Sequence, residues 1–143
     1  MPTVTFQAHI RSDEGVRSIA KINQHELIID EPPRLGGSDQ GPNPLEYVLT
    51  ALGGCINVLA HSFAPQFNVE IQDLQVHVEG DLNPDGFRGI DPDAKVGYEE
   101  IRYEVTVDSP SANENIEALL AHVDAFCPVK DSLLGTKIVR TNK

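Results

Sequence analysis

Two cysteines are the residues of this sequence best suited to chemistry. They are Cys55 and Cys127, they stand 72 positions apart, and the chain has no others. A thiolate is a nucleophile, and thiols are oxidised to sulfenic acid or joined as a disulfide, so a pair can support a redox cycle. Core filling is the competing interpretation, because free cysteines are commonly buried.

The sequence around each cysteine suggests its setting. Cys127 precedes Pro128, and proline favours the first position of a helix, which predicts Cys127 at a helix N-cap. Free N–H groups and the helix dipole stabilise a thiolate there, although a small residue at a tight corner explains the pattern equally well. Cys55 falls on the edge of an apolar helical stripe, where core packing is the simpler interpretation and ionisation would need a nearby cation.

Alternating apolar residues predict strands over 4–11, 16–22 and 27–29, which would form an antiparallel meander. Residues 31–44 follow with three glycines and four prolines, a composition that excludes regular structure. A loop of this length inside a compact domain is often functional.

A long helix is predicted to follow this loop, with Asn43 as its cap and Pro44 in its first turn. At 100° per residue its apolar side chains occupy two faces, which predicts a central helix buried on two sides. Gly53 and Gly54 in mid-helix favour the close approach of another backbone, such as that of a second helix. The main stripe consists of Leu45, Val48, Leu49, Leu52, Ile56, Leu59 and Phe63, and the opposite face carries Tyr47, Ala51 and Val58.

The second half of the chain alternates strands with a helix. Strands are expected over 69–81, 98–107 and 137–140, a helix over 113–126, and a short helical turn from Pro128 to Gly135. The order of elements, without internal repeat or linker, predicts one α+β domain over residues 1–143.

Charge and composition exclude several classes of function. Eleven basic residues against 22 acidic ones give a net charge of −11, which disfavours nucleic acids and anionic membranes. The start does not resemble a signal peptide and no 18 apolar residues run uninterrupted, so a cytoplasmic protein is expected. The five histidines lack ligand-like spacing, and the calcium-like start at residues 81–86 has Pro92 where a glutamate is needed, so no metal is expected.

Three strings of residues together resemble the OsmC/Ohr family. Residues 41–46, Gly-Pro-Asn-Pro-Leu-Glu, and residues 51–55, Ala-Leu-Gly-Gly-Cys, are similar to the central-helix signature of that family. Residues 127–129, Cys-Pro-Val, are similar to its second-cysteine motif. The resemblance covers essentially the whole chain, with the same order of elements.

The resemblance implies an α+β, intertwined homodimer in which two long central helices pack together and antiparallel sheets from both chains wrap them. It also implies a thiol peroxidase that reduces organic hydroperoxides in oxidative stress defence. By this likeness Cys55 is the attacking thiolate, Cys127 is the resolving thiol, and a dithiol reductant restores both. No metal or organic cofactor is implied.

The sequence departs from the peroxidase branches and is more similar to the uncharacterised OsmC-like branch. The family's glutamate follows the Asn-Pro pair directly, whereas here Glu46 stands one place later and faces away from Cys55 on the helix. Arg34 is the first candidate for the cation that stabilises the thiolate, and Arg17 is the alternative. These departures leave open a non-catalytic dimer that binds a small apolar or reactive sulfur ligand at its subunit interface.

Overall fold

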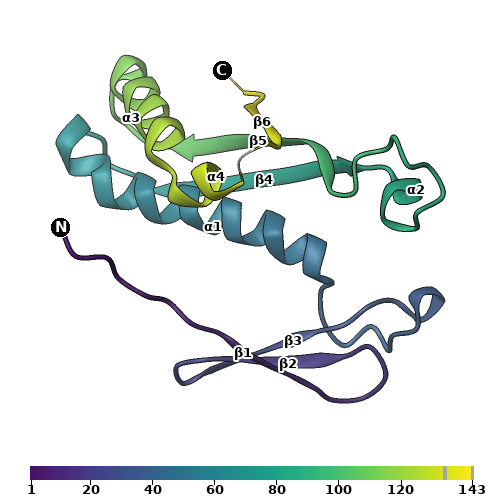
Figure 1. Cartoon of the computed structure of the whole chain (residues 1–143). Helices are drawn as coiled ribbons and strands as arrows, with labels where there is room; N and C mark the ends of the chain where they lie inside the picture. The colour runs from purple at the N-terminus through teal and green to yellow at the C-terminus, as the bar shows by residue number, and fades with distance from the viewer. Residues whose placement is uncertain (134, 143) are drawn as a thin grey trace. The chain divides into compact units, whose positions relative to one another are not determined.

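The computed structural model describes residues 1–133 and 135–142 of the chain. They form two compact units, one from Met1 to Val48 and one from Leu49 onward (Figure 1). Helix α1 (Pro44–Phe63) contributes its first turn to the first unit and the rest to the second. The α+β class predicted from the sequence is confirmed, and a single domain over 1–143 stays a prediction.

The first unit is a three-stranded antiparallel sheet in the order β1-β2-β3. Its strands are β1 (His9–Ser12), β2 (Ser18–Ile22) and β3 (His25–Ile29), which confirms the meander. The prediction of a strand from residue 4 was wrong, because the ladder with β2 begins only at His9 and a strand needs a pairing partner. Phe6 is accordingly 93% exposed.

One buried carboxylate organises the loop after β3. Asp30 is 1% exposed and accepts backbone N–H groups from Glu31 at 2.8 Å, Ser38 at 3.2 Å and Gln40 at 3.1 Å. Burial alone would raise the pKa of Asp30, but the three N–H donors outweigh it, so the pKa of this carboxyl is lowered. The loop, including the short 3₁₀ helix η1 (Pro33–Leu35), is therefore tied to the end of the sheet.

Helix α1 spans the predicted residues, but only one of its faces is buried. Leu52, Ile56 and Ala60 enter the core of the second unit. Val58 on the opposite face is 60% exposed in the single chain, so burial of a second side stays a prediction. The absence of a side chain at Gly53 is explained within the chain, since a Cβ there would stand 3.1 Å from Val78 Cγ2. The close neighbour is therefore the strand β4 (Asp73–Leu82) and not a second helix.

The segment Pro44–Phe67 is long and apolar enough, by length and composition, to cross a membrane. The expectation that nothing spans a membrane rested on uninterrupted apolar runs, which polar residues such as Asn57 break. The core helix of a soluble protein passes the same test, and this helix supplies core residues to the second unit.

The second unit is built on a three-stranded sheet in the order β4-β5-β6. β4 (Asp73–Leu82) and β5 (Tyr98–Asp108) are antiparallel, and β6 (Lys137–Arg140) pairs parallel to β5. A parallel partner requires a crossover connection. Here the crossover contains α3 (Asn113–Phe126) and α4 (Pro128–Ser132), as Figure 1 shows.

Two short helices lie where loop or strand was expected. The 3₁₀ helix η2 (Ala64–Phe67) occupies the stretch after α1, and β4 begins at Asp73 instead of residue 69. Helix α2 (Pro84–Phe87) lies in the predicted loop and is capped by Asn83, whose side chain accepts the Asp85 N–H. The segment that begins like a calcium loop is thus a capped turn.

The core of the second unit is aliphatic, as the low aromatic content requires. It joins one face of α1 to α3 and β5, and Cys127 belongs to it at 3% exposed. Apolar burial of this kind is the main favourable term in folding. The largest fully buried apolar side chains are Leu52, Ile56, Ile101, Leu119 and Val123.

Candidate redox site

The two cysteines come from different elements of the second unit and meet at its core. Cys55 lies in the middle of α1, half-buried and packed against the core cluster. Cys127 is the buried residue at which α3 ends and α4 begins. Because α1 and the α3–α4 crossover pack in one core, residues 72 positions apart in sequence become neighbours.

The Cys127 and Cys55 sulfur atoms stand 3.3 Å apart, and both thiols are free. This separation is a hydrogen bond, with the Cys127 thiol donating to Cys55 Sγ. A disulfide has an S–S length of about 2.05 Å, so closing the bond requires an approach of roughly 1.3 Å. The arrangement can therefore support thiol–disulfide chemistry.

Cys127 is both the C-cap of α3 and the N-cap of α4. Its Sγ accepts the backbone N–H of Lys130 at 3.4 Å, and its carbonyl oxygen accepts the N–H of Asp131 at 3.0 Å. Pro128, which lacks an N–H, occupies the first position of α4 as predicted. The predicted N-cap geometry of Cys127 is confirmed.

This cap does not make Cys127 acidic. Burial raises the pKa of the Cys127 thiol, and the Lys130 N–H opposes that effect only in part. The hydrogen bond to Cys55 raises the pKa further, because it engages the proton of Cys127. Cys127 is therefore a protonated thiol at neutral pH.

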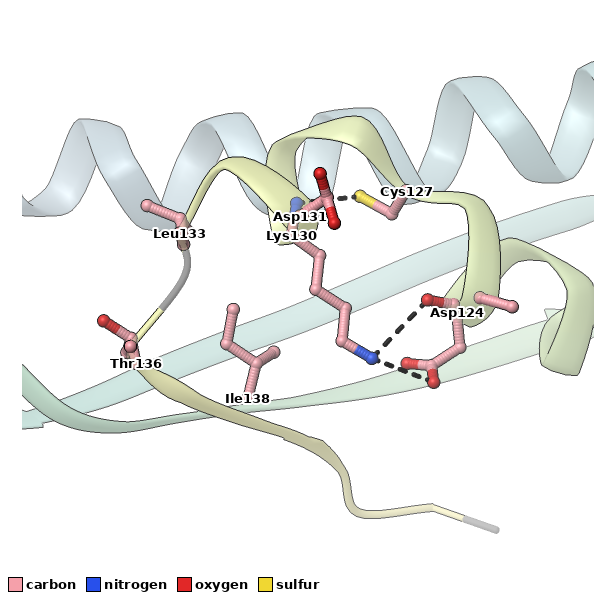
Figure 2. A pocket seen from close by; sticks show the side chains of 9 residues that line it. Asp124, Cys127, Lys130, Asp131, Leu133, Thr136 and Ile138 are labelled. Carbon is pink, nitrogen blue, oxygen red and sulfur yellow. Dashed lines mark hydrogen bonds and ion pairs between the residues drawn. The ribbon is translucent and has the colours of Figure 1, made fainter.

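An open pocket of about 330 Å³ lies beside Cys127 (Figure 2). On its wall the Lys130 ammonium forms an ion pair with Asp124 Oδ2 at 3.0 Å and donates to the Asp124 carbonyl oxygen at 3.5 Å. The buried Tyr103 hydroxyl donates to the other carboxylate oxygen of Asp124. The remaining walls come from Ala125, Asp131, Leu133, Gly135, Thr136 and Ile138.

Arg34 and Glu46, the other candidate site residues, both lie in the first unit. Arg34 is in η1 and exposed, and its side chain has no hydrogen-bond or ion-pair partner among the described residues. Glu46 lies in the first turn of α1, where its carboxylate accepts the Asn43 N–H at 2.9 Å. The Asn43 side chain accepts the Glu46 N–H in return, so Glu46 completes a capping box.

Arg17, the alternative cation, is fully engaged within the first unit. Its Nε lies 2.8 Å from Asp13, and its second terminal nitrogen lies 3.1 Å from Glu14. The hydrogen bond that Arg17 donates to Asp13 is the main reason that the pKa of Arg17 is raised. These two acids neutralise Arg17 and leave Arg34 as the cation with capacity for another partner.

Sequence reasoning did not find Lys130, Asp124 and Tyr103. The six-residue spacing of Asp124 and Lys130 matches no helical neighbour relation, and only the bend at Cys127 brings them together. No group of three or more His, Cys, Asp or Glu residues in the described part of the chain could hold a metal ion.

Comparison with known proteins identifies the family. The sequence model described as OsmC-like protein matches residues 37–142, which is most of the chain and includes both cysteines. The chain belongs to the OsmC-like protein family. A relative from Mycoplasma pneumoniae named hydroperoxide reductase is 25% identical over 136 residues, covering 94% of this chain and 89% of that protein.

Solved OsmC-like structures have the same fold. An OsmC-like protein from Mycoplasma pneumoniae superposes with a TM-score of 0.83 at 22% identity, over 98% of this chain and 96% of that one. An organic hydroperoxide resistance protein OsmC from Legionella pneumophila gives a TM-score of 0.69 at 17% identity, over 99% of both chains. These likenesses establish the OsmC-like fold predicted from the sequence.

Proposed function

We propose that this OsmC-like protein is a thiol-dependent peroxidase that reduces hydroperoxides, organic ones especially, in defence against oxidative stress. The observation that carries the proposal is the 3.3 Å separation of the Cys55 and Cys127 sulfur atoms. Two relatives support it, since one is named hydroperoxide reductase and the other an organic hydroperoxide resistance protein.

In the proposed cycle the Cys55 thiolate attacks the terminal oxygen of the hydroperoxide. The O–O bond breaks, an S–O bond forms, and the alkoxide takes up a proton and leaves as an alcohol. The sulfur of Cys127 then attacks that of Cys55 while its own proton and the hydroxyl group leave as water. A dithiol reductant restores both thiols and is itself oxidised to a disulfide.

The different surroundings of the two thiols support these roles. Cys55 is half-buried, so it is more accessible to a hydroperoxide than Cys127, and its sulfur accepts the hydrogen bond from the Cys127 thiol. Cys127 is buried, protonated and directed at Cys55, which suits a thiol that waits for the sulfenic acid. This difference supports attack by Cys55 and resolution by Cys127.

We assign the stabilisation of the Cys55 thiolate to Arg34, with Glu46 as the carboxylate that orients it. The free guanidinium of Arg34 supports this choice over Arg17, whose charge is neutralised by Asp13 and Glu14. An arginine near a thiolate lowers the barrier by stabilising negative charge.

The protein acts, in this proposal, as a cytoplasmic homodimer that uses only a hydroperoxide and a dithiol. Support comes from the apolar residues that the described chain leaves exposed, Val58 on α1 at 60% and Phe6 at 93%. Exposed apolar surface of this kind favours association with a partner of matching shape.

The experiment is a rapid oxidation followed by mass spectrometry. Reduced protein is mixed with one equivalent of cumene hydroperoxide, quenched within seconds, and its intact and peptide masses are recorded. We expect the wild type to lose two hydrogens through a Cys55–Cys127 link, and Cys127→Ser to gain one oxygen at Cys55. The proposal fails if Cys55→Ser consumes the hydroperoxide as fast as the wild type.

The second candidate is a non-catalytic dimer that binds a small apolar or reactive sulfur ligand at its subunit interface. The capping role of Glu46 favours it, because a carboxylate that completes a helix start is explained without catalysis. This candidate predicts no accelerated oxidation of either cysteine by hydroperoxide. Alkylation of Cys55 that is no faster than that of an unfolded peptide would support it.

A further inference from the structure

The bend at Cys127 is held by contacts that reach back to the sheet. Tyr103 lies on β5 and is 2% exposed, and its hydroxyl donates to the carboxylate of Asp124 in the last turn of α3. The same carboxylate binds the ammonium group of Lys130 in α4 at 3.0 Å. The three residues thus connect β5, α3 and α4 across the corner that carries Cys127.

Lys130 contacts this corner in two ways. Its backbone N–H donates to Cys127 Sγ at 3.4 Å, and its ammonium also donates to the Asp124 carbonyl oxygen at 3.5 Å (Figure 2). The side chain therefore fixes the angle at which α4 leaves α3, and the backbone fixes the sulfur relative to α4. Loss of the ion pair would remove a side-chain contact between α4 and α3, which are separated by one residue, Cys127, that belongs to neither helix.

We propose that Lys130 and Asp124 are positioning residues for the resolving step, because their ion pair holds the Cys127 sulfur within reach of Cys55. The proposal rests on the proposed function for its place in a peroxidase cycle. The positioning role itself does not require peroxidase activity, since any reaction that joins the two sulfurs depends on the same alignment. Attack at a sulfur requires an approach along the bond that breaks, so an error of about 1 Å slows the reaction severely.

The proposed step balances without another reagent. The Cys127 sulfur forms a bond to the Cys55 sulfur, the S–O bond of the sulfenic acid breaks, and the Cys127 proton leaves with the hydroxyl group as water. Cys55 is already oxidised at that point, and the proposal assigns the Lys130–Asp124 pair to this step and not to the attack on the hydroperoxide. The first step and the second step should respond differently to the loss of Lys130.

The first test separates these two steps. Lys130→Met is oxidised with cumene hydroperoxide, dimedone traps the sulfenic acid on Cys55, and disulfide closure is followed in parallel. We expect closure to slow on the order of tenfold while the formation of sulfenic acid keeps its rate. Lys130→Arg should restore closure, because arginine also pairs with a carboxylate.

Lys137→Met is the matched control, since it removes another ion-paired lysine. Lys137 lies on β6, and its ammonium is 3.1 Å from the carboxylate of Glu100 on β5. It should close the disulfide at the wild-type rate. Tyr103→Phe should slow closure less than Lys130→Met does, because it removes a hydrogen bond to the Asp124 carboxylate and leaves the ion pair with Lys130 in place. Closure at the wild-type rate in Lys130→Met, or equal slowing of both steps, would overturn the proposal.

The second test does not depend on peroxidase activity. Wild type and variants are equilibrated with mixtures of reduced and oxidised glutathione, and the fraction of Cys55–Cys127 disulfide is measured. A tenfold smaller effective concentration of the two thiols in Lys130→Met would raise the reduction potential of the pair by about 30 mV. An unchanged reduction potential in Lys130→Met would overturn the proposal. A shifted potential, in a protein whose cysteines are not oxidised by hydroperoxide, would count against the proposed function alone.

Discussion

Asn43 and Glu46 bond each other reciprocally across the first turn of α1. The Asn43 N–H donates to Glu46 Oε1 at 2.9 Å, and the Glu46 N–H donates to Asn43 Oδ1 at 2.8 Å. This exchange satisfies two donors that a helix start otherwise leaves open. It also gives Glu46 a structural task in addition to the catalytic one proposed for it.

The two tasks of Glu46 can be separated with one substitution. Glutamine also completes a capping box, so Glu46→Gln should leave the free energy of unfolding within about 0.5 kcal/mol of the wild type. If the charge orients Arg34, the rate of Cys55 oxidation by hydroperoxide should fall on the order of tenfold. Urea unfolding and stopped-flow oxidation measure the two quantities, and an unchanged rate would reduce Glu46 to a helix cap.

Arg34 and Arg17 form a matched pair of substitutions in the first unit. Arg34→Gln should slow the oxidation of Cys55 by hydroperoxide on the order of a hundredfold, because it removes a donor from developing negative charge. Arg17→Gln should keep the oxidation rate and lower the midpoint of thermal unfolding, because it leaves Asp13 and Glu14 unpaired. The reverse result would identify Arg17 as the functional cation.

The adjacent glycines of α1 test the proposed homodimer. A Cβ at Gly54 would meet no atom within 4 Å, so Gly54→Ala should stabilise an isolated chain by about 0.5–1 kcal/mol. If a second α1 packs there, the same methyl group should weaken the dimer in sedimentation at low concentration. Gly53→Ala is the control, because its methyl group would press on Val78 of the same chain. A Gly54→Ala protein with unchanged association would argue against helix contact at this position.

The surroundings of Tyr103 and Cys127 predict how stability depends on pH. Burial raises both pKa values above their ordinary values of 10.0 and 9.0, and the bond to Asp124 adds to the effect on Tyr103. The folded protein therefore holds these protons more tightly than the unfolded chain, and this stabilisation is complete at neutral pH and lost as the pH rises through the folded pKa values.

The measurement is urea unfolding of the reduced protein across the alkaline range. The free energy of unfolding should fall by about 1 kcal/mol per pH unit above roughly pH 9, where the unfolded thiol and phenol release their protons. The decline should be shallower in Cys127→Ser, which lacks one of the two groups. A profile that stays flat to about pH 11 would contradict the burial of these groups.

The spacing of apolar residues and the positions of proline and glycine predicted most of the helices and strands. The helix bounds at 44–63 and 113–126 and the last strand at 137–140 agree with the structure, because apolar spacing and Pro or Asn caps mark them directly. The first strand was predicted too long, because alternation does not reveal where a pairing partner ends.

Of the residues at the candidate redox site, only the two cysteines could be predicted from the sequence. The N-cap position of Cys127 follows from the proline after it, and the resemblance to a family paired it with Cys55. The contacts of Lys130 depend on a bend between two helices, which no local pattern encodes. The Glu46 cap could have been read from its spacing of three from Asn43.

The late position of the Cys127 corner in the sequence has a consequence for the newly made chain. Tyr103, Asp124 and Lys130 hold this corner, so it gains its support only after residue 130 has left the ribosome. Until then Cys55, synthesised 72 residues before Cys127, has no thiol held against it. An oxidant present during translation therefore meets a single cysteine, and oxidation beyond the sulfenic acid is the hazard at that stage.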